Sequence, residues 1–329
     1  NPAYYGGNKS VATSESYTAT KIDRYTPSIS VVARIGGSDY NSTWTNQNVT
    51  FVFTASFGGS GAIIKFSNDN SYFTDTEATS GFNTGETNII TQNETFIWTV
   101  SKECKEIPYY FAISSGTNIT VNVENPITLR IDKTKPTISD AVLQRSPNSN
   151  GWVGETSPAT FTASEQSGWA GVASITVSPA ITLKVNGVIS GTPQDYNNNC
   201  ELMISDYREY TVTVTDKAGN VATEVFRFKV DTKIPELMVE AGSYIPGIWQ
   251  NTAAKVNLLA QAGASGVKFY YIRGAVEILI GSNEFLYDID KTNPFQDVRN
   301  IFIFDEEINE QIQFKAVTGA GHSAILNFG

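Results

Sequence analysis

Short stretches in which apolar and polar residues alternate recur along the chain, bounded by turns rich in glycine and asparagine. The clearest stretches lie at 49–55, 159–163 and 256–260. Successive side chains of an extended strand point to opposite faces, so a period of two predicts strands that are buried on one face only. We therefore expect an all-β chain.

The pattern also predicts hairpins. The clearest has its turn at 216–220, between two alternating stretches. There the Asp216 side chain can accept hydrogen bonds from the turn, and Gly219 supplies the positive φ that a short loop requires. Residues 314–322 repeat this hairpin, and residues 110–118 repeat it in degenerate form.

A longer phrase occurs three times: an aliphatic residue, Asp, three variable residues, Pro, one residue and an aliphatic residue. Its prolines are Pro27, Pro136 and Pro235, about 100 residues apart. This spacing, with strand-like sequence between the marks, predicts tandem β-sandwich modules. The expected domains cover 23–132, 133–231 and 232–329, and residues 1–22 are expected to be the closing strand of a preceding repeat or an N-terminal extension.

The linkers are predicted to be short and stiff, because proline fixes its own φ and restricts the residue before it. Stiff linkers favour an elongated rod. The chain starts with an apparent closing strand and ends in the strand after its third hairpin. We therefore expect it to be a fragment of a longer repeat protein.

Three features of the sequence resemble the bacterial immunoglobulin-like (Big-type) repeats of cell-surface proteins. They are the Asp-x-x-x-Pro junctions, the Trp-Thr-Asn-x-x-Val opening at 44–49 and the Tyr-Thr-Val-x-Val-Thr-Asp-Lys-Ala-Gly-Asn-Val-Ala ending at 210–222. The resemblance covers nearly the whole chain and is strongest in the second unit. It implies immunoglobulin-like sandwiches and an extracellular place, on a bacterial cell surface or secreted.

Such repeats serve as stalks, spacers or adhesive modules, and they also flank enzymes that act on glycans. We therefore expect a non-catalytic, monomeric stalk or adhesion region whose partner is a glycan or protein of a host or cell surface. The alternative is a glycan-binding accessory region of a secreted carbohydrate-active enzyme. Exposed aromatic side chains along one sheet face would favour the alternative, and buried tryptophans would favour the stalk.

Composition excludes several other functions. The net charge is −10 over 329 residues, and an acidic surface repels phosphate backbones and anionic membranes. No apolar run reaches the roughly 18 residues that a membrane helix needs. We expect neither nucleic-acid binding nor direct membrane insertion.

Catalytic chemistry is also poorly represented. His322 is the only histidine and is expected in an exposed turn, and Cys104 and Cys200 fall in different repeats, which excludes a disulfide within one module. No zinc site or nucleophile–histidine pair of ordinary kind can be assembled from them. The carboxylates at 305–307, with Asp288 and Asp290, are expected in solvated loops, so the chain is not predicted to be an enzyme.

The aspartates near the junctions have two interpretations. Asp132, Asp216 and Asp231, with Asp23 at the first junction, provide oxygen ligands that could hold calcium between modules. Alternatively, an Asp before a proline-containing turn caps backbone amides. The second interpretation is favoured, because the six or more oxygen ligands of a calcium site are not visible in one stretch. No other cofactor is expected.

The aromatic residues give the remaining candidates. Trp44, Trp152 and Trp249 recur in register and are expected to pack at the end of each sandwich. Trp169 lies in a loop between glycines, where it would either stack on a sugar or fold back over the core edge, and the second is favoured. Tyr270 and Tyr271 alternate in a strand, so one of them, with Tyr270 as the candidate ligand contact, should face outward.

Overall fold

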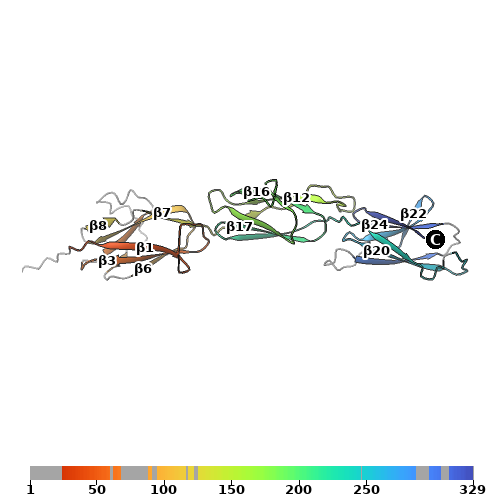
Figure 1. Cartoon of the computed structure of the whole chain (residues 1–329), viewed down its shortest axis with the longest axis horizontal. Helices are drawn as coiled ribbons and strands as arrows, with labels where there is room; N and C mark the ends of the chain where they lie inside the picture. The colour runs from red at the N-terminus through yellow and green to blue at the C-terminus, as the bar shows by residue number, and fades with distance from the viewer. Residues whose placement is uncertain are drawn as a thin grey trace, which may run out of the picture. The chain divides into compact units, whose positions relative to one another are not determined.

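A computed structural model of the chain describes residues 24–59, 62–67, 88–90, 95–115, 118–121, 125–245, 247–286, 296–304 and 311–328. Regular structure in these ranges consists of β-strands, which form six antiparallel sheets (Figure 1). The prediction of an all-β chain is confirmed. Contacts divide the chain into two units: the first comprises Asn1–Ser42, Asn48–Lys102 and Glu106–Leu129, and the second comprises Thr43–Gln47, Glu103–Lys105 and Arg130–Gly329.

The strands of residues 28–131 form two sheets. One has the order β2 (Ser38–Asp39), β1 (Ser28–Ile35), β3 (Val49–Ser56), β6 (Thr95–Val100). The other has the order β5 (Asn88–Ile90), β4 (Ala62–Ser67), β7 (Cys104–Ser115), β8 (Asn118–Val121), with β9 (Ile127–Ile131) also paired to β7. The rings of Phe51 and Phe53 on β3 contact Phe111 on β7, with centroids 4.9 and 5.3 Å apart, so the two sheets share one core.

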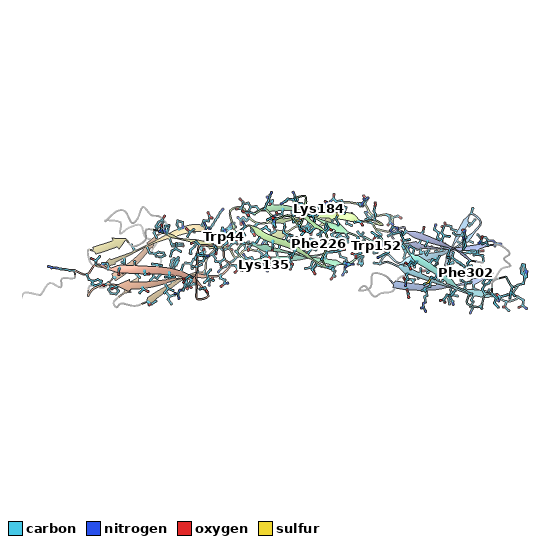
Figure 2. All side chains as sticks on the ribbon, in the orientation of Figure 1. Trp44, Lys135, Trp152, Lys184, Phe226 and Phe302 are labelled. Carbon is cyan, nitrogen blue, oxygen red and sulfur yellow. The ribbon has the colours of Figure 1, made fainter. Side chains whose placement is uncertain are left out.

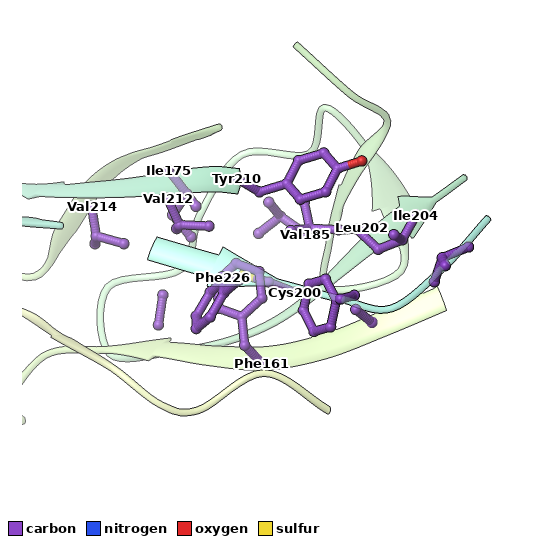
Figure 3. Packing of buried hydrophobic residues seen from close by; sticks show 14 of the residues in the cluster. Phe161, Ile175, Val185, Cys200, Leu202, Ile204, Tyr210, Val212, Val214 and Phe226 are labelled. Atoms are coloured by element: carbon purple, nitrogen blue, oxygen red, sulfur yellow. The ribbon is translucent and has the colours of Figure 1, made fainter. Parts of the chain in front are cut away.

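Residues 137–227 form a second pair of sheets. The larger has the order β10 (Thr137–Ile138), β12 (Ser157–Ser164), β16 (Asn197–Ile204), β14 (Leu183–Val185), β15 (Val188–Ile189), and β11 (Val142–Leu143) also pairs with β12. The smaller has the order β13 (Val172–Ser178), β17 (Glu209–Asp216), β18 (Val221–Arg227). Figure 3 shows the shared core, in which Phe161 and Leu202 from one sheet lie with Val212 and Phe226 from the other.

Residues 236–328 form the remaining two sheets. One has the order β19 (Glu236–Glu240), β20 (Ala254–Ala262), β23 (Gln296–Phe304), and the other β22 (Val276–Ile280), β21 (Val267–Arg273), β24 (Ile312–Thr318), β25 (Ser323–Phe328). Leu258 of the first sheet belongs to the same buried cluster as Phe269 and Phe314 of the second. Phe302, labelled with Phe226 in Figure 2, packs at the edge of this cluster and contacts Phe314.

The strands predicted from alternation are confirmed as β3, β12 and β20, in each of which every second residue is buried. The predicted hairpin at 216–220 joins β17 to β18, and Gly219 has φ of 92°. The hairpin predicted at 314–322 joins β24 to β25, and the degenerate one at 110–118 joins β7 to β8.

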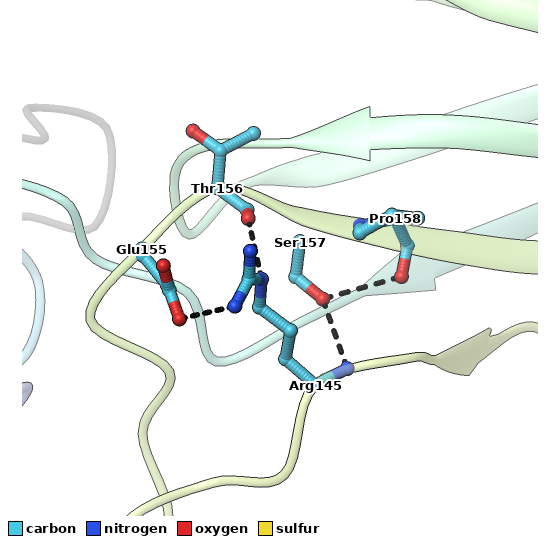
Figure 4. A network of polar contacts seen from close by, with 5 residues as sticks. All are labelled: Arg145, Glu155, Thr156, Ser157 and Pro158. Atoms are coloured by element: carbon cyan, nitrogen blue, oxygen red, sulfur yellow. Dashed lines mark hydrogen bonds and ion pairs between the residues drawn. The ribbon is translucent and has the colours of Figure 1, made fainter.

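A polar network fixes the entry to β12 (Figure 4). The Arg145 Nε donates to the Thr156 carbonyl at 3.1 Å, and its guanidinium pairs with Glu155. Both charged side chains are largely exposed, so the ion pair contributes little to stability. The buried Ser157 hydroxyl matters more, because it accepts the Arg145 amide at 3.2 Å and donates to the Pro158 carbonyl at 3.2 Å, which leaves no buried donor unpaired there.

The prediction that three tryptophans pack at sandwich ends is wrong for Trp249, whose side chain is 70% exposed. Trp152, labelled in Figure 2, does pack, edge-on against Tyr207 with ring centroids 5.4 Å apart. At the corresponding end of the third pair of sheets, Tyr244 covers the core by contacting Phe304 and Phe328. Trp249, in the loop after Tyr244, is left outside.

Substituting Gly219 tests the β17–β18 turn. A β-carbon there would meet only Asn46 Nδ2, at 3.5 Å, so the penalty of Gly219→Val is conformational rather than steric. Forcing a β-branched residue into positive φ should lower the free energy of unfolding by about 1–3 kcal/mol. The shift of one calorimetric transition of the whole chain measures this.

Thr223→Val is the matched control, because Thr223 is an exposed β18 residue in an ordinary strand conformation. We expect its transition to stay within about 0.5 kcal/mol of the wild type. Equal behaviour of the two variants would contradict a conformational requirement for glycine at position 219.

Candidate metal centre

Three carboxylates gather at one end of the sandwich formed by residues 137–227. Asp132 follows β9, Glu165 follows β12 and Asp216 is the last residue of β17. Each contributes an oxygen atom, and these atoms all lie within 4.8 Å of one another. The residues are 0, 8 and 2% exposed, respectively. Three segments distant in sequence therefore place acidic groups in one buried volume, which we call the carboxylate triad.

Asp132 is held by backbone amides. Its Oδ1 accepts the Thr134 N–H at 3.0 Å, and its Oδ2 accepts the Ala170 N–H at 3.0 Å. The Asp132 amide itself donates to the Thr45 carbonyl at 2.9 Å. The first bond is the turn cap predicted for an Asp before proline, and the second fixes the loop between β12 and β13.

Asp216 is held by Asn220, at the other end of the turn between β17 and β18. The Asn220 amide donates to Asp216 Oδ1 at 2.8 Å, and Asn220 Nδ2 donates to Asp216 Oδ2 at 2.8 Å. The same Nδ2 also donates to the Asp132 carbonyl at 2.9 Å. Asn220 thus joins two members of the triad through one buried amide group.

Glu165 is the least satisfied of the three. Its Oε1 accepts the Gln166 N–H at 2.7 Å. Its Oε2 is buried and has no hydrogen-bond partner. A buried carboxylate oxygen without a partner is costly, because it has lost water and gained nothing in exchange.

Electrostatics reinforces that cost. Burial raises the pKa of Asp132 above its usual value, against the lowering effect of the Ala170 and Thr134 amides, and the charges of Asp216 and Glu103 raise it further. Burial likewise raises the pKa of Glu165, opposed by the Gln166 amide and assisted by the charges of Asp132 and Asp216. No member of the triad forms an ion pair with a side chain in the described ranges.

Asp231, the third aspartate predicted as a calcium ligand, lies apart from the triad. Its position after a closing strand corresponds to that of Asp132, but the side chains around it are neutral. Its Oδ1 accepts the Lys233 N–H at 3.1 Å, and its Oδ2 accepts the N–H and hydroxyl of Ser265 at 2.9 and 2.5 Å. Thr318 occupies the place that Asp216 has in the preceding turn, and its Oγ1 accepts the His322 N–H at 3.0 Å. The structure therefore brings together Asp132 and Asp216 but not Asp231.

The sequence interpretation missed Glu165. The loop that carries it, residues 165–171, is three residues longer than its counterpart at 263–266. In the shorter loop Gly263 lies against Asp231, and any side chain there would collide with the Asp231 carboxylate. The sequence shows an acidic residue at the start of the longer loop, but only the fold brings one of its oxygens within 4.8 Å of oxygens of Asp132 and Asp216.

The aromatic candidates have different surroundings. Trp169 contacts Trp44, with ring centroids 6.5 Å apart and planes at 46°, and both side chains are half-buried. Trp169 thus lies against another indole ring, and both its packing over the core edge and its role as a ligand contact stay predictions. Tyr271 is buried against Phe302 and Phe314, and Tyr270 is half-buried on the opposite face of β21, as alternation predicts.

The other chemistry-bearing residues give no second site. Cys104 and Cys200 are buried and form no disulfide with each other, as expected from their separation, and burial raises the pKa of Cys200 to about 11. His322 occupies the predicted turn but is half-buried rather than exposed, because its ring lies against Gly154. Asp23, Asp288, Asp290 and the carboxylates at 305–307 lie outside the described residues.

A shallow hollow of about 310 Å³ lies beside β12 and β16, with Lys184, Asn199 and Glu201 in its lining. Lys184 and Glu201 are joined by an ion pair of 2.6 Å. The one aromatic residue in the lining of this hollow, Phe161, belongs to the core, so the hollow offers no ring for stacking on a sugar.

Comparisons with known proteins give distant structural likenesses. No family model and no curated protein matches the chain. Bovine butyrophilin is 10% identical over 54% of this chain and 92% of its own, with a TM-score of 0.33. Dimeric latent PorU from Porphyromonas gingivalis is 11% identical (91% of this chain, 33% of its own, TM-score 0.20), and Escherichia coli alpha-2-macroglobulin is 9% identical (92% and 32%, TM-score 0.23).

The chain spans about a third of the length of PorU and of the macroglobulin. The assignment of the fold rests on the strand pairing and shared cores described above rather than on these likenesses. Within the described residues, no helix is long and apolar enough to cross a membrane.

Replacing Asn220 by Ala tests the hydrogen bonds that hold the triad. The substitution removes the donor to Asp216 Oδ2 and to the Asp132 carbonyl, and leaves both buried acceptors without it. We expect urea unfolding to show a loss of about 1–3 kcal/mol. Asn199→Ala, at an exposed position of β16, should change stability by less than about 0.5 kcal/mol, and a similar small change in Asn220→Ala would refute this role.

Proposed function

We propose that this chain is a non-catalytic extracellular region of a bacterial surface protein, built of three immunoglobulin-like sandwiches in series that act as a stalk or present an adhesive face. The Big-type resemblance of its junctions supports the extracellular setting. The acidic, strand-only character of the described chain is compatible with it.

The observation that carries the proposal is a hydrogen-bonded contact that recurs at two successive turns. The Ala218 carbonyl, in the turn after β17, accepts the Asn46 amide at 3.0 Å. The Gly319 carbonyl, in the turn after β24, accepts Asn148 Nδ2 at 2.9 Å and Asn150 Nδ2 at 3.1 Å. Each turn is thus fastened to a loop from about 170 residues earlier in the chain, which supports a spacer with ordered connections.

Small-angle scattering of the whole chain tests the stalk. A compact globule of this length has a radius of gyration of about 20 Å. Three sandwiches in series, each roughly 40 Å long, would give a maximum dimension of roughly 120 Å and a clearly larger radius of gyration. A radius near the globular value would contradict the stalk.

The second candidate is a glycan-binding accessory region of a secreted carbohydrate-active enzyme. The exposure of Trp249 favours it, because an indole ring in solvent can stack on a sugar face. Ile245 and Ile248 in the same loop are also exposed. Trp169, the loop aromatic that the sequence offered as a candidate for this role, has Trp44 against its ring.

A screen against glycans and matrix proteins tests whether the loop that carries Trp249 binds a glycan. If the accessory role holds, the chain should bind a glycan, and Trp249→Ala should weaken that binding roughly fivefold to thirtyfold, since stacking on one aromatic ring contributes on the order of 1–2 kcal/mol. Trp152→Ala, which removes a tryptophan that packs on Tyr207, is the control. A hit that survives Trp249→Ala would rule out this loop as the glycan-binding surface.

A further inference from the structure

We propose that Asp132, Glu165 and Asp216 bind one divalent cation, and calcium in preference to magnesium. The inference does not depend on the proposed function. It rests on the geometry of the triad, on the unpartnered oxygen of Glu165 and on the contrast with the uncharged counterpart around Asp231.

The geometry fits one ion. Calcium lies about 2.3–2.6 Å from its oxygen ligands, so two oxygens on the same ion are at most about 5 Å apart. The three carboxylate oxygens, all within 4.8 Å of one another, satisfy that limit. They also come from three separate segments, so one ion would bind all three together.

The hydrogen bonding indicates a cation rather than another group. The protein donors that reach the triad are the Thr134 and Ala170 amides at Asp132, the amide and side chain of Asn220 at Asp216, and the Gln166 amide at Glu165. Glu165 Oε2 has no donor at all. An ionised carboxylate only accepts, and a buried volume lined by acceptors is matched by a positive ion.

The charge balance supports the same conclusion. Three ionised carboxylates carry a charge of about −3 in a buried volume with no basic partner in the described ranges, and a doubly charged ion would offset most of it. Calcium suits this arrangement better than magnesium. Magnesium dehydrates reluctantly and is usually held by one or two carboxylates, whereas calcium accepts several protein oxygens in irregular geometry.

The setting of Asp231 is an internal comparison. It has the same backbone cap, but Ser265 and Thr318 are neutral and Gly263 leaves no carboxylate beside it. Ser265 donates two hydrogen bonds to Asp231 Oδ2, so this carboxylate has no unpartnered oxygen that a cation would stabilise. The inference therefore assigns one site to the described chain, at the triad.

Calorimetric titration of the whole chain with calcium chloride, after treatment with chelator, tests the site. We expect one ion per chain, and a melting temperature that rises with calcium and returns to its starting value with chelator. Glu165→Gln and Asp216→Asn should each weaken binding at least a hundredfold. Asp195→Asn, which removes an exposed carboxylate paired with Lys217, should bind as the wild type does.

Glu165→Gln also distinguishes a lost site from a misfolded protein. It removes one of three repelling charges and supplies a donor, so in chelator it should melt no lower than the wild type while losing the calcium-dependent rise. Terbium, bound in place of calcium, gives an independent signal. Trp169 is next to Ala170, whose amide donates to Asp132, so the Trp169 indole should sensitise the luminescence of a terbium ion at the triad.

Absence of binding to the wild type at 10 mM calcium would overturn the proposal. So would unchanged calcium affinity in both Glu165→Gln and Asp216→Asn, or an equal loss in Asp195→Asn, which would indicate general attraction to an acidic surface. Magnesium binding as tight as calcium binding would overturn the stated preference.

Discussion

A buried aspartate at the end of a closing strand is the constraint on which this structure depends. Where the chain leaves β9 for the proline-containing segment, backbone amides lose their sheet partners and need other acceptors. Asp132 supplies them with two oxygens, one for Thr134 nearby and one for Ala170 far along the chain. Asp231 does the same for Lys233 and Ser265. One carboxylate thereby fixes both the local turn and the position of a distant loop.

The two copies of this cap differ in what surrounds them. Asp231 receives a hydroxyl as well as amides, so its charge is solvated by fixed dipoles. Asp132 instead faces two more carboxylates, which add repulsion to the cost of burial. The same cap of backbone amides thus occurs in two settings. At Asp231 the donors balance the carboxylate charge, whereas at Asp132 the neighbouring carboxylates leave repulsion that the donors do not balance. The difference lies in the loop that follows the first long strand, because only the longer loop contains an acidic residue, Glu165.

Much of the fold follows from local sequence. A period of two predicts β3, β12 and β20, and the turn residues predict the β17–β18 hairpin with its positive φ at Gly219. These features depend on neighbours in sequence. The capping role of Asp132 was also predictable, because one of its two hydrogen bonds goes to a residue two positions away.

The rest depends on contacts between distant residues. Glu165 joins Asp132 and Asp216 only through the conformation of its loop, for which a single sequence gives no pattern. The exposure of Trp249 arises because Tyr244 covers the core in that place, and both residues are aromatic and close in sequence. The regular spacing of the tryptophans therefore predicted three equivalent packing positions, but the side chain of the third tryptophan is exposed.

The charge of the triad is relevant to the proposed extracellular setting. Extracellular calcium modules bind with dissociation constants of about 10⁻⁴–10⁻³ M, whereas cytosolic calcium sensors and buffers bind far more tightly. A site of three carboxylates has few protein ligands, and one of the three is held by a single hydrogen bond, which favours weak binding. Such a site would be filled only where calcium is abundant. Without an ion, the three carboxylates repel one another. Calcium would therefore stabilise the junction at Asp132 where it is abundant, outside the cell, whereas the stability of the junction at Asp231 would not change with calcium. A dissociation constant near the millimolar range would therefore support both the site and the location, and a nanomolar one would argue for a different setting.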